Sequence, residues 1–258
     1  MVTAPRALVL RCAGTNCDRE ALDGFARAGA RVDLVHVRRI YQRPETLRET
    51  DLVVFPGGFS YGDDLGAGTI QALETRLFLL EALGEVVARG GLVVGICNGF
   101  QVLVKSGLLP GRRRGEVEVT LAGNDSNRFE DRWVRLRVED SRAVHLPRGL
   151  EFDVPVAHGE GKFVAKDEAT LDAIRAERLV AFRYVAPGGG EPAFPWNPNG
   201  SQDAIAGICD PTGRILGLMP HPERNVLFHH HPDWTRKRDR REGAGLGILR
   251  ALVDAARR

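Results

Sequence analysis

Short apolar runs alternate with amphipathic segments through the first hundred residues, and this alternation limits the possible folds more than any other feature. The apolar runs, rich in Val, Leu and Ile as buried strands are, cover residues 7–11, 32–37, 51–55 and 91–96. Segments with helical spacing cover residues 18–28 and 69–88, and another opens at Gly99 and runs to Lys105. Strands that alternate with helices pair in parallel through right-handed crossovers. We therefore expect an α/β fold.

The pattern changes from about residue 113, where extended segments follow one another without long helices between them. These segments cover residues 116–121, 132–139, 154–157, 180–185, 204–209 and 215–219. A helix over 244–255 closes the chain, and the Pro- and Gly-rich residues 186–200 form a loop. We expect a mixed sheet flanked by helices in one domain spanning residues 1–258, with the basic segment 229–243 as a loop.

Bulk composition excludes several classes of protein. The net charge of +2 is too small to indicate nucleic-acid binding by a general positive field. The four cysteines form no C-x-x-C pair, so we expect no metal site, and free thiols fit a reducing cytoplasm. The N-terminus lacks the apolar region of a secretion signal, and no apolar run is long enough to span a membrane.

The strand over 91–96 ends abruptly in a cysteine flanked by glycines, Gly95-Ile96-Cys97-Asn98-Gly99. A strand that turns sharply into a helix needs small flanking residues, as in the nucleophile elbow G-x-S-x-G. The helix N-terminus beneath Cys97 would favour the thiolate, and Asn98 would face a developing oxyanion. The pattern alone also fits a buried structural cysteine at a glycine-rich turn.

A thiolate nucleophile needs a base and a group that orients the base. In GLMPHPER, His221 lies between two prolines and Glu223 is two residues further on. Side chains at i and i+2 of an extended segment point the same way, so Glu223 is placed to hold one imidazole nitrogen. The pattern alone also fits an ordinary surface loop.

A third segment leaves the strand over 51–55 through Pro56-Gly57-Gly58. Glycines there allow backbone N–H groups to approach a ligand, so Gly58 is a candidate oxyanion donor. The spacing does not fit the dinucleotide-binding fingerprint, and no P-loop is present in the sequence. A simple βα turn is the alternative.

These three segments, in this order, resemble the class I (triad-type) glutamine amidotransferases, a flavodoxin-like α/β fold with a nucleophile elbow. Further segments resemble the glutaminase subunits of phosphoribosylformylglycinamidine synthase, an enzyme of purine synthesis. They are GTNCDRE, FPGGFSYGD, GICNGFQ, AHGEGKF, NPNGS and MPHPER.

The resemblance implies a reaction and its residues. Cys97 would attack the side-chain amide of L-glutamine, and His221, oriented by Glu223, would move the protons. Backbone N–H groups of Gly58 and Asn98 would hold the oxyanion. The remaining residues expected to bind glutamine or shape its pocket are Gly57, Gln101, His158 and Gly159.

The resemblance also implies partners. A synthetase subunit would receive the ammonia and use ATP and Mg²⁺ to amidate formylglycinamide ribonucleotide, so this chain itself would need no cofactor. A small third subunit is left open. The alternatives are an amidotransferase serving another synthase and a catalytically silent docking module.

Two weaker features concern cysteine and histidine. Cys17, in GTNCD, has no base at a suitable spacing in the sequence, so we do not expect it to act as a nucleophile. Cys12 and Cys209 lie in apolar runs and are expected in the core. Three consecutive histidines, 229–231, cannot all turn toward one ion without distortion, so we expect a surface loop there rather than a metal site.

Overall fold

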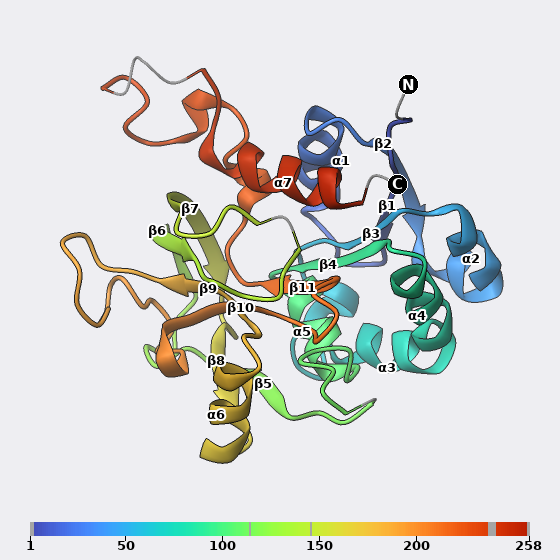
Figure 1. Cartoon of the computed structure of the whole chain (residues 1–258), viewed down its shortest axis with the longest axis horizontal. Coiled ribbons are helices and arrows are strands. Elements are labelled where there is room, and N and C mark those ends of the chain that lie inside the picture. The colour runs from blue at the N-terminus through green and yellow to red at the C-terminus, as the bar shows by residue number, and fades with distance from the viewer. Residues whose placement is uncertain (1–2, 114, 145, 237–240, 257–258) are drawn as a thin grey trace.

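The computed structural model describes residues 3–113, 115–144, 146–236 and 241–256. Its main feature is a nine-stranded mixed sheet with the strand order β2-β1-β3-β4-β11-β10-β9-β6-β7. The five strands from β2 to β11 pair in parallel, and those from β11 to β7 pair in antiparallel fashion. This confirms the expected change of pattern between the two halves of the sequence (Figure 1).

The parallel part is built from the apolar runs of the first half and one late strand. Its strands are β1 (Arg6–Arg11), β2 (Arg31–His36), β3 (Leu52–Phe55), β4 (Leu92–Ile96) and β11 (Ile215–Leu218). Strands β3, β4 and β11 are buried along their whole length, as expected for the centre of a sheet covered on both faces. Strand β2 lies at the edge and alternates between exposed and half-buried residues.

The antiparallel part contains β10 (Ile205–Cys209), β9 (Val180–Tyr184), β6 (Glu130–Val138) and β7 (Glu151–His158). In β6 and β7, buried residues alternate with half-buried or exposed ones, because one face of an antiparallel sheet packs on the core. A separate two-stranded sheet pairs β5 (Val119–Ala122) with β8 (Lys162–Ala165).

Helices cover both faces of the parallel part. They are α1 (Asp18–Arg27), α2 (Val37–Gln42), α3 (Thr69–Phe78), α4 (Leu80–Ala88), α5 (Asn98–Lys105) and α7 (Ala244–Ala255). Helix α6 (Glu168–Ala176) lies beside β8 of the small sheet instead. In Figure 1, α1 and α7 lie on one side of β3 and β4, and α3, α4 and α5 lie on the other. Among the described residues, no helix is long and apolar enough to cross a membrane.

The expected helix over 69–88 is wrong as one continuous element. The backbone leaves helical geometry at Leu79 (φ −120°, ψ −12°), which separates α3 from α4. Leu79 is fully buried, while the preceding Phe78 is half exposed and lies against the ring of Tyr41. The apolar spacing continues through the break and no Gly or Pro marks it, so periodicity alone does not reveal it.

Three elements were not expected from the sequence: α2, β8 and α6. Helix α6 carries a local signal, because the Asp167 side chain accepts a hydrogen bond from the Thr170 backbone N–H at 2.8 Å. Helix α2 is only six residues long and starts where β2 ends, so it has little room for a periodic pattern.

The basic segment 229–243 begins within a short 3₁₀ turn (Phe228–His230), and residues 237–240 lie outside the described residues. His229 and His230 are exposed, as expected of a surface loop. The expectation is wrong for His231, which is buried beside the ring of Trp133, with its Nε2 3.3 Å from a carboxylate oxygen of Asp153.

Candidate active site

The elbow places Cys97 in a strained conformation at the end of β4. Its φ is +53° and its ψ −108°, a region that residues with a side chain rarely adopt. A Cβ on Gly99 would lie 1.9 Å from the Phe55 carbonyl oxygen, and one on Gly95 would lie 2.6 Å from the Gly99 carbonyl oxygen. Both flanking positions therefore require glycine, as the sequence pattern predicted.

His221 and Glu223 form a fully buried pair after β11. The two residues flank the start of a short 3₁₀ turn (Pro222–Arg224), and Nδ1 of His221 is 2.7 Å from Oε1 of Glu223. The His221 backbone N–H donates to the Pro155 carbonyl at 2.9 Å, which attaches this loop to β7. With Nδ1 facing the carboxylate, Nε2 is left to exchange protons with another group.

Cys97 and His221 meet because β3, β4 and β11 are adjacent and parallel, so their carboxyl ends open at one edge of the sheet. Gly57 lies between the two side chains, where an added Cβ would be 2.7 Å from His221 Cε1 and 3.4 Å from Cys97 Cβ. Burial alone would lower the pKa of His221, but the carboxylate of Glu223 and the neighbouring Cys97 raise it well above its usual range. The surroundings of the imidazole therefore favour its protonated form.

Gly58 has a φ of +138°, and an added Cβ would lie 2.7 Å from the Asn16 backbone nitrogen. The residue pairs with Thr15 in an isolated bridge, so the loop after β3 is fixed to the loop after β1. The glycine at this position is required by conformation and by close backbone approach.

The Asn98 side chain is engaged in holding the loop after β3. Its Oδ1 accepts from the Ser60 backbone N–H at 3.1 Å, and its Nδ2 donates to Asp63 and to Gln101 at 3.1 and 3.0 Å. The backbone N–H of Asn98 opens α5, where helical N–H groups have no partner within the helix. The structure therefore leaves the backbone N–H of Asn98, rather than its side chain, available to a ligand.

Gln101 connects α5 to the loop after β7. Its Nε2 donates to the Glu160 carbonyl at 2.6 Å. The Glu160 carboxylate in turn accepts from the Ala67 backbone N–H and lies 3.8 Å from Nζ of Lys105. The segments expected to line the glutamine pocket are thus joined by hydrogen bonds, although they are distant in the sequence.

His158 is buried, and both of its ring nitrogens lie beside asparagine side chains. Nδ1 is 3.1 Å from Asn124 Oδ1, and Nε2 is 3.5 Å from Asn199 Nδ2. Burial, with a smaller contribution from His221, lowers the pKa of His158 to about 4, so the ring is neutral. Gly159 follows on the exposed side, near Phe129, and its carbonyl accepts from the Asn124 backbone N–H.

Two further side chains, which were not expected from the sequence, support the site. Asn124 holds the end of β7 and the loop after it through three side-chain hydrogen bonds: Oδ1 faces His158 Nδ1 and accepts from the Gly161 N–H, and Nδ2 donates to the His158 carbonyl. A fourth, from Nδ2 to the Arg128 carbonyl, lies within its own loop. Asn199, within the NPNGS segment, bonds Gly161 from the other side. No local pattern singles out Asn124, because its role depends on a loop that follows it by more than thirty residues.

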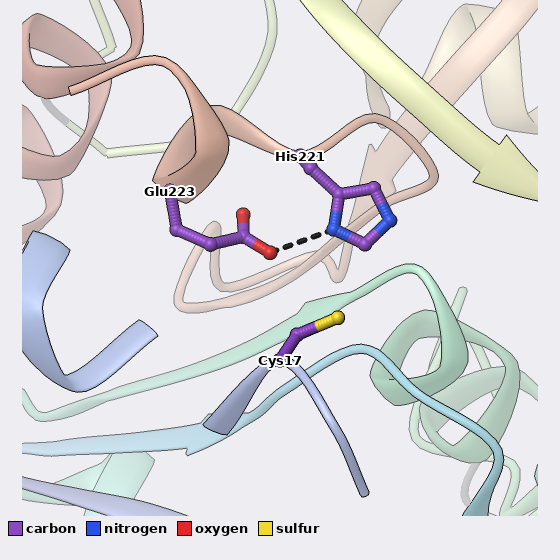
Figure 2. A group of neighbouring side chains, drawn as sticks. All are labelled: Cys17, His221 and Glu223. Atoms are coloured by element: carbon purple, nitrogen blue, oxygen red, sulfur yellow. Dashed lines mark hydrogen bonds and ion pairs between the residues drawn. The ribbon is translucent and has the colours of Figure 1, made fainter. Parts of the chain in front are cut away.

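Cys17 lies closer to the His–Glu pair than its place in the sequence indicates. It has no base at a suitable spacing in the sequence, yet the fold brings Cys17 Sγ, a nitrogen of His221 and a carboxylate oxygen of Glu223 within 4.8 Å of one another (Figure 2). Its Sγ lies 3.1 Å from Asn16 Oδ1 and accepts a hydrogen bond from Arg224 Nη2 at 3.1 Å. Cys12 and Cys209 are buried, as expected.

Comparisons with known proteins agree with this geometry. The CobB/CobQ-like glutamine amidotransferase domain matches residues 4–254. A phosphoribosylformylglycinamidine synthase subunit PurQ from Dehalococcoides mccartyi is 43% identical over 253 residues, with 98% of each chain covered. The PurQ subunit of Methanococcus maripaludis is 41% identical over 242 residues, covering 91% of this chain and 88% of that relative.

A solved structure points the same way. A chain in the structure of PurLQS from Thermotoga maritima superposes with a TM-score of 0.72 at 30% identity, covering 98% of this chain and 99% of that one. The α/β fold of the class I amidotransferases is therefore confirmed. Full-length similarity of this degree shows that the chain belongs to the PurQ family of glutamine amidotransferase subunits.

Proposed function

We propose that this chain hydrolyses L-glutamine to glutamate and ammonia, and that the ammonia serves the formation of formylglycinamidine ribonucleotide in purine synthesis. One observation carries the proposal: a cysteine at a strained strand-to-helix corner lies next to a buried His–Glu pair. The full-length similarity to PurQ subunits supports the same substrate and the same pathway.

In the proposed reaction, Cys97 Sγ attacks the amide carbon of glutamine. His221 takes the thiol proton as Cys97 attacks, and the Glu223 carboxylate, which raises the pKa of His221, stabilises the imidazolium that forms. The backbone N–H groups of Gly58 and Asn98 hold the oxyanion, each contributing on the order of a hundredfold or more in rate. His221 then gives its proton to the departing ammonia, and water, deprotonated by His221, hydrolyses the thioester.

The glutamine pocket is proposed to lie among the loops after β3 and β7 and the start of α5. Gly57 leaves room for His221 beside Cys97, and Gln101 fixes the Gly159 loop through Glu160. We propose that His158 supports this loop rather than touching glutamine, because Asn124 and Asn199 occupy both of its ring nitrogens.

We propose that a synthetase subunit receives the ammonia and carries the ATP- and Mg²⁺-dependent step. The PurLQS name of the Thermotoga maritima structure supports an assembly of this kind, and a small third subunit is part of the proposal. Cys97 is 5% exposed and His221 1% exposed, so the site of the free chain is nearly closed. We therefore expect low glutaminase activity until the synthetase binds.

The remaining proposals concern the setting of the reaction. We propose that residues 1–258 act as one domain, since strands from both halves of the chain share the large sheet. A cytoplasmic location is proposed because all four cysteines are free, as thiols are in a reducing compartment. No cofactor is proposed for this chain.

The test compares wild type with Cys97→Ala in the complex with the synthetase, measuring ADP release that depends on formylglycinamide ribonucleotide. We expect the variant to lose the rate supported by glutamine and to keep the rate supported by ammonium. A variant that kept its glutamine-dependent rate would refute the role of Cys97.

A further inference from the structure

A second thiol lies beside the proposed catalytic pair and has no part in the proposed reaction. Cys17 begins α1, its backbone N–H donates to the Gly57 carbonyl, and its side chain is 2% exposed. Figure 2 shows the thiol of Cys17 facing the ring of His221, whose Nδ1 faces Glu223. A thiol, an imidazole and a carboxylate thus converge from opposite ends of the chain.

The cluster holds lone pairs without partners. The Glu223 side chain is 0% exposed, and its Oε2 has no hydrogen-bond partner among the described residues. Buried polar atoms are normally hydrogen-bonded, so this carboxylate oxygen has the capacity to take one further ligand. Anionic oxygen, imidazole nitrogen and thiolate sulfur are together the donor set of Zn²⁺.

The three side chains are close enough to share one ion after a local rearrangement. Tetrahedral Zn²⁺ places S, N and O donors roughly 3.3–3.6 Å from one another. One ligand atom from each of the three residues lies within 4.8 Å of the other two, and Nδ1 and Oε1, which share a hydrogen bond, are 2.7 Å apart. An ion bound to Nδ1 would take the place of this hydrogen bond, and the Glu223 carboxylate would have to turn away from the ring to leave room for it.

We propose that Cys17 Sγ, His221 Nδ1 and a carboxylate oxygen of Glu223 bind a thiophilic divalent cation, Zn²⁺, which inhibits the enzyme. The ion displaces two protons, one from the thiol and one from Nδ1, because metal ligands must be deprotonated. The charges balance: two anionic ligands offset the ion, and Arg224, which bonds Cys17, is itself paired with Glu20 at 3.3 Å.

Inhibition follows from the loss of the hydrogen bond that orients His221. An imidazole whose Nδ1 is bound to metal, and whose carboxylate partner is also a ligand, is no longer the base that the reaction needs. This consequence rests on the proposed function, whereas binding of the ion does not.

The experiment uses the purified full-length chain, freed of metal, with Co²⁺ as a spectroscopic probe and Zn²⁺ as competitor, in the absence of glutamine. A Co²⁺–thiolate bond gives a near-ultraviolet charge-transfer band. We expect one Co²⁺ per chain with this band in wild type, in Cys97→Ala and in the matched control Cys12→Ser. We expect Cys17→Ser to lack the band and to bind Zn²⁺ at least tenfold more weakly.

Glu223→Gln, which keeps the side-chain shape, provides a second variant and should also bind Zn²⁺ at least tenfold more weakly. The proposal is overturned if wild type binds no Co²⁺, if the band survives in Cys17→Ser, or if Cys97→Ala abolishes it. Because these readouts need no glutamine turnover, a failure of the proposed glutaminase function would show separately, in the ADP assay of Cys97→Ala.

Discussion

Adding a single methyl group at Gly57 should disable glutamine hydrolysis while leaving the fold intact. The new Cβ would lie 2.7 Å from His221 Cε1, about 0.7 Å short of the 3.4 Å at which ordinary van der Waals contact begins. The imidazole is buried and bonded to Glu223, so it has to shift away from Cys97 by a comparable amount. Misplacement of a catalytic group by about 1 Å costs about a hundredfold in rate.

We therefore expect Gly57→Ala to lower kcat/KM for glutamine by about a hundredfold, or about 2.7 kcal/mol of transition-state stabilisation. Overpacking should cost about 1–3 kcal/mol in the free energy of unfolding. The assay is glutamine-dependent ADP release by the complex, with ammonium-dependent release as the measure of intact docking. Ammonium should support the wild-type rate, because ammonia bypasses the altered site.

Gly84→Ala is the matched control. Gly84 lies in α4, and a Cβ there would have no neighbour within 4 Å. The control should keep full activity and gain about 0.4–1 kcal/mol in the free energy of unfolding. Full glutamine-dependent activity in Gly57→Ala would refute the reasoning, since His221 could then not lie where the structure places it.

Three further predictions test other contacts of the site. Glu223→Gln removes the carboxylate that raises the pKa of His221, so the proton of His221 should be lost at lower pH, as followed by histidine NMR; an unmoved titration would contradict the pairing. Asn98→Ala leaves the buried Ser60 N–H without its acceptor, which should cost about 1–3 kcal/mol in denaturant unfolding and raise KM for glutamine more than it lowers kcat. His158 has a folded pKa of about 4, below its ordinary value near 6.5, so the unfolded chain takes up the proton first as the pH falls. The contribution of neutral His158 to the free energy of unfolding is present above pH 6.5 and should fall by about 3 kcal/mol as the pH drops toward 4. The free energy of unfolding of His158→Gln should depend less on pH over this range. Identical pH dependence in wild type and variant would rule the explanation out.

Much of the fold follows from local pattern. The strands from β1 to β4 lie within one or two residues of the expected ranges, because each is an apolar run bounded by turn residues or a helix start. The expected single helix over 69–88 is wrong because the break at Leu79 depends on the tertiary packing of that buried side chain, which leaves no local pattern. Strand β8 is held by its pairing with β5, and helix α2 is too short to show a periodic pattern.

Some features of the candidate site follow from local sequence, and others depend on tertiary contacts. The sequence by itself determined the elbow at Cys97 and the spacing of His221 and Glu223, since the flanking glycines and the i, i+2 interval act within a few residues. Only the tertiary structure decided that the Asn98 side chain holds a loop, that His158 is enclosed by Asn124 and Asn199, and that Cys17 meets the His–Glu pair. These contacts join segments from distant parts of the chain: the adjacency of the parallel strands brings together Asn98, Cys17 and the His–Glu pair, whereas the antiparallel strand β7 carries His158 to its two asparagines.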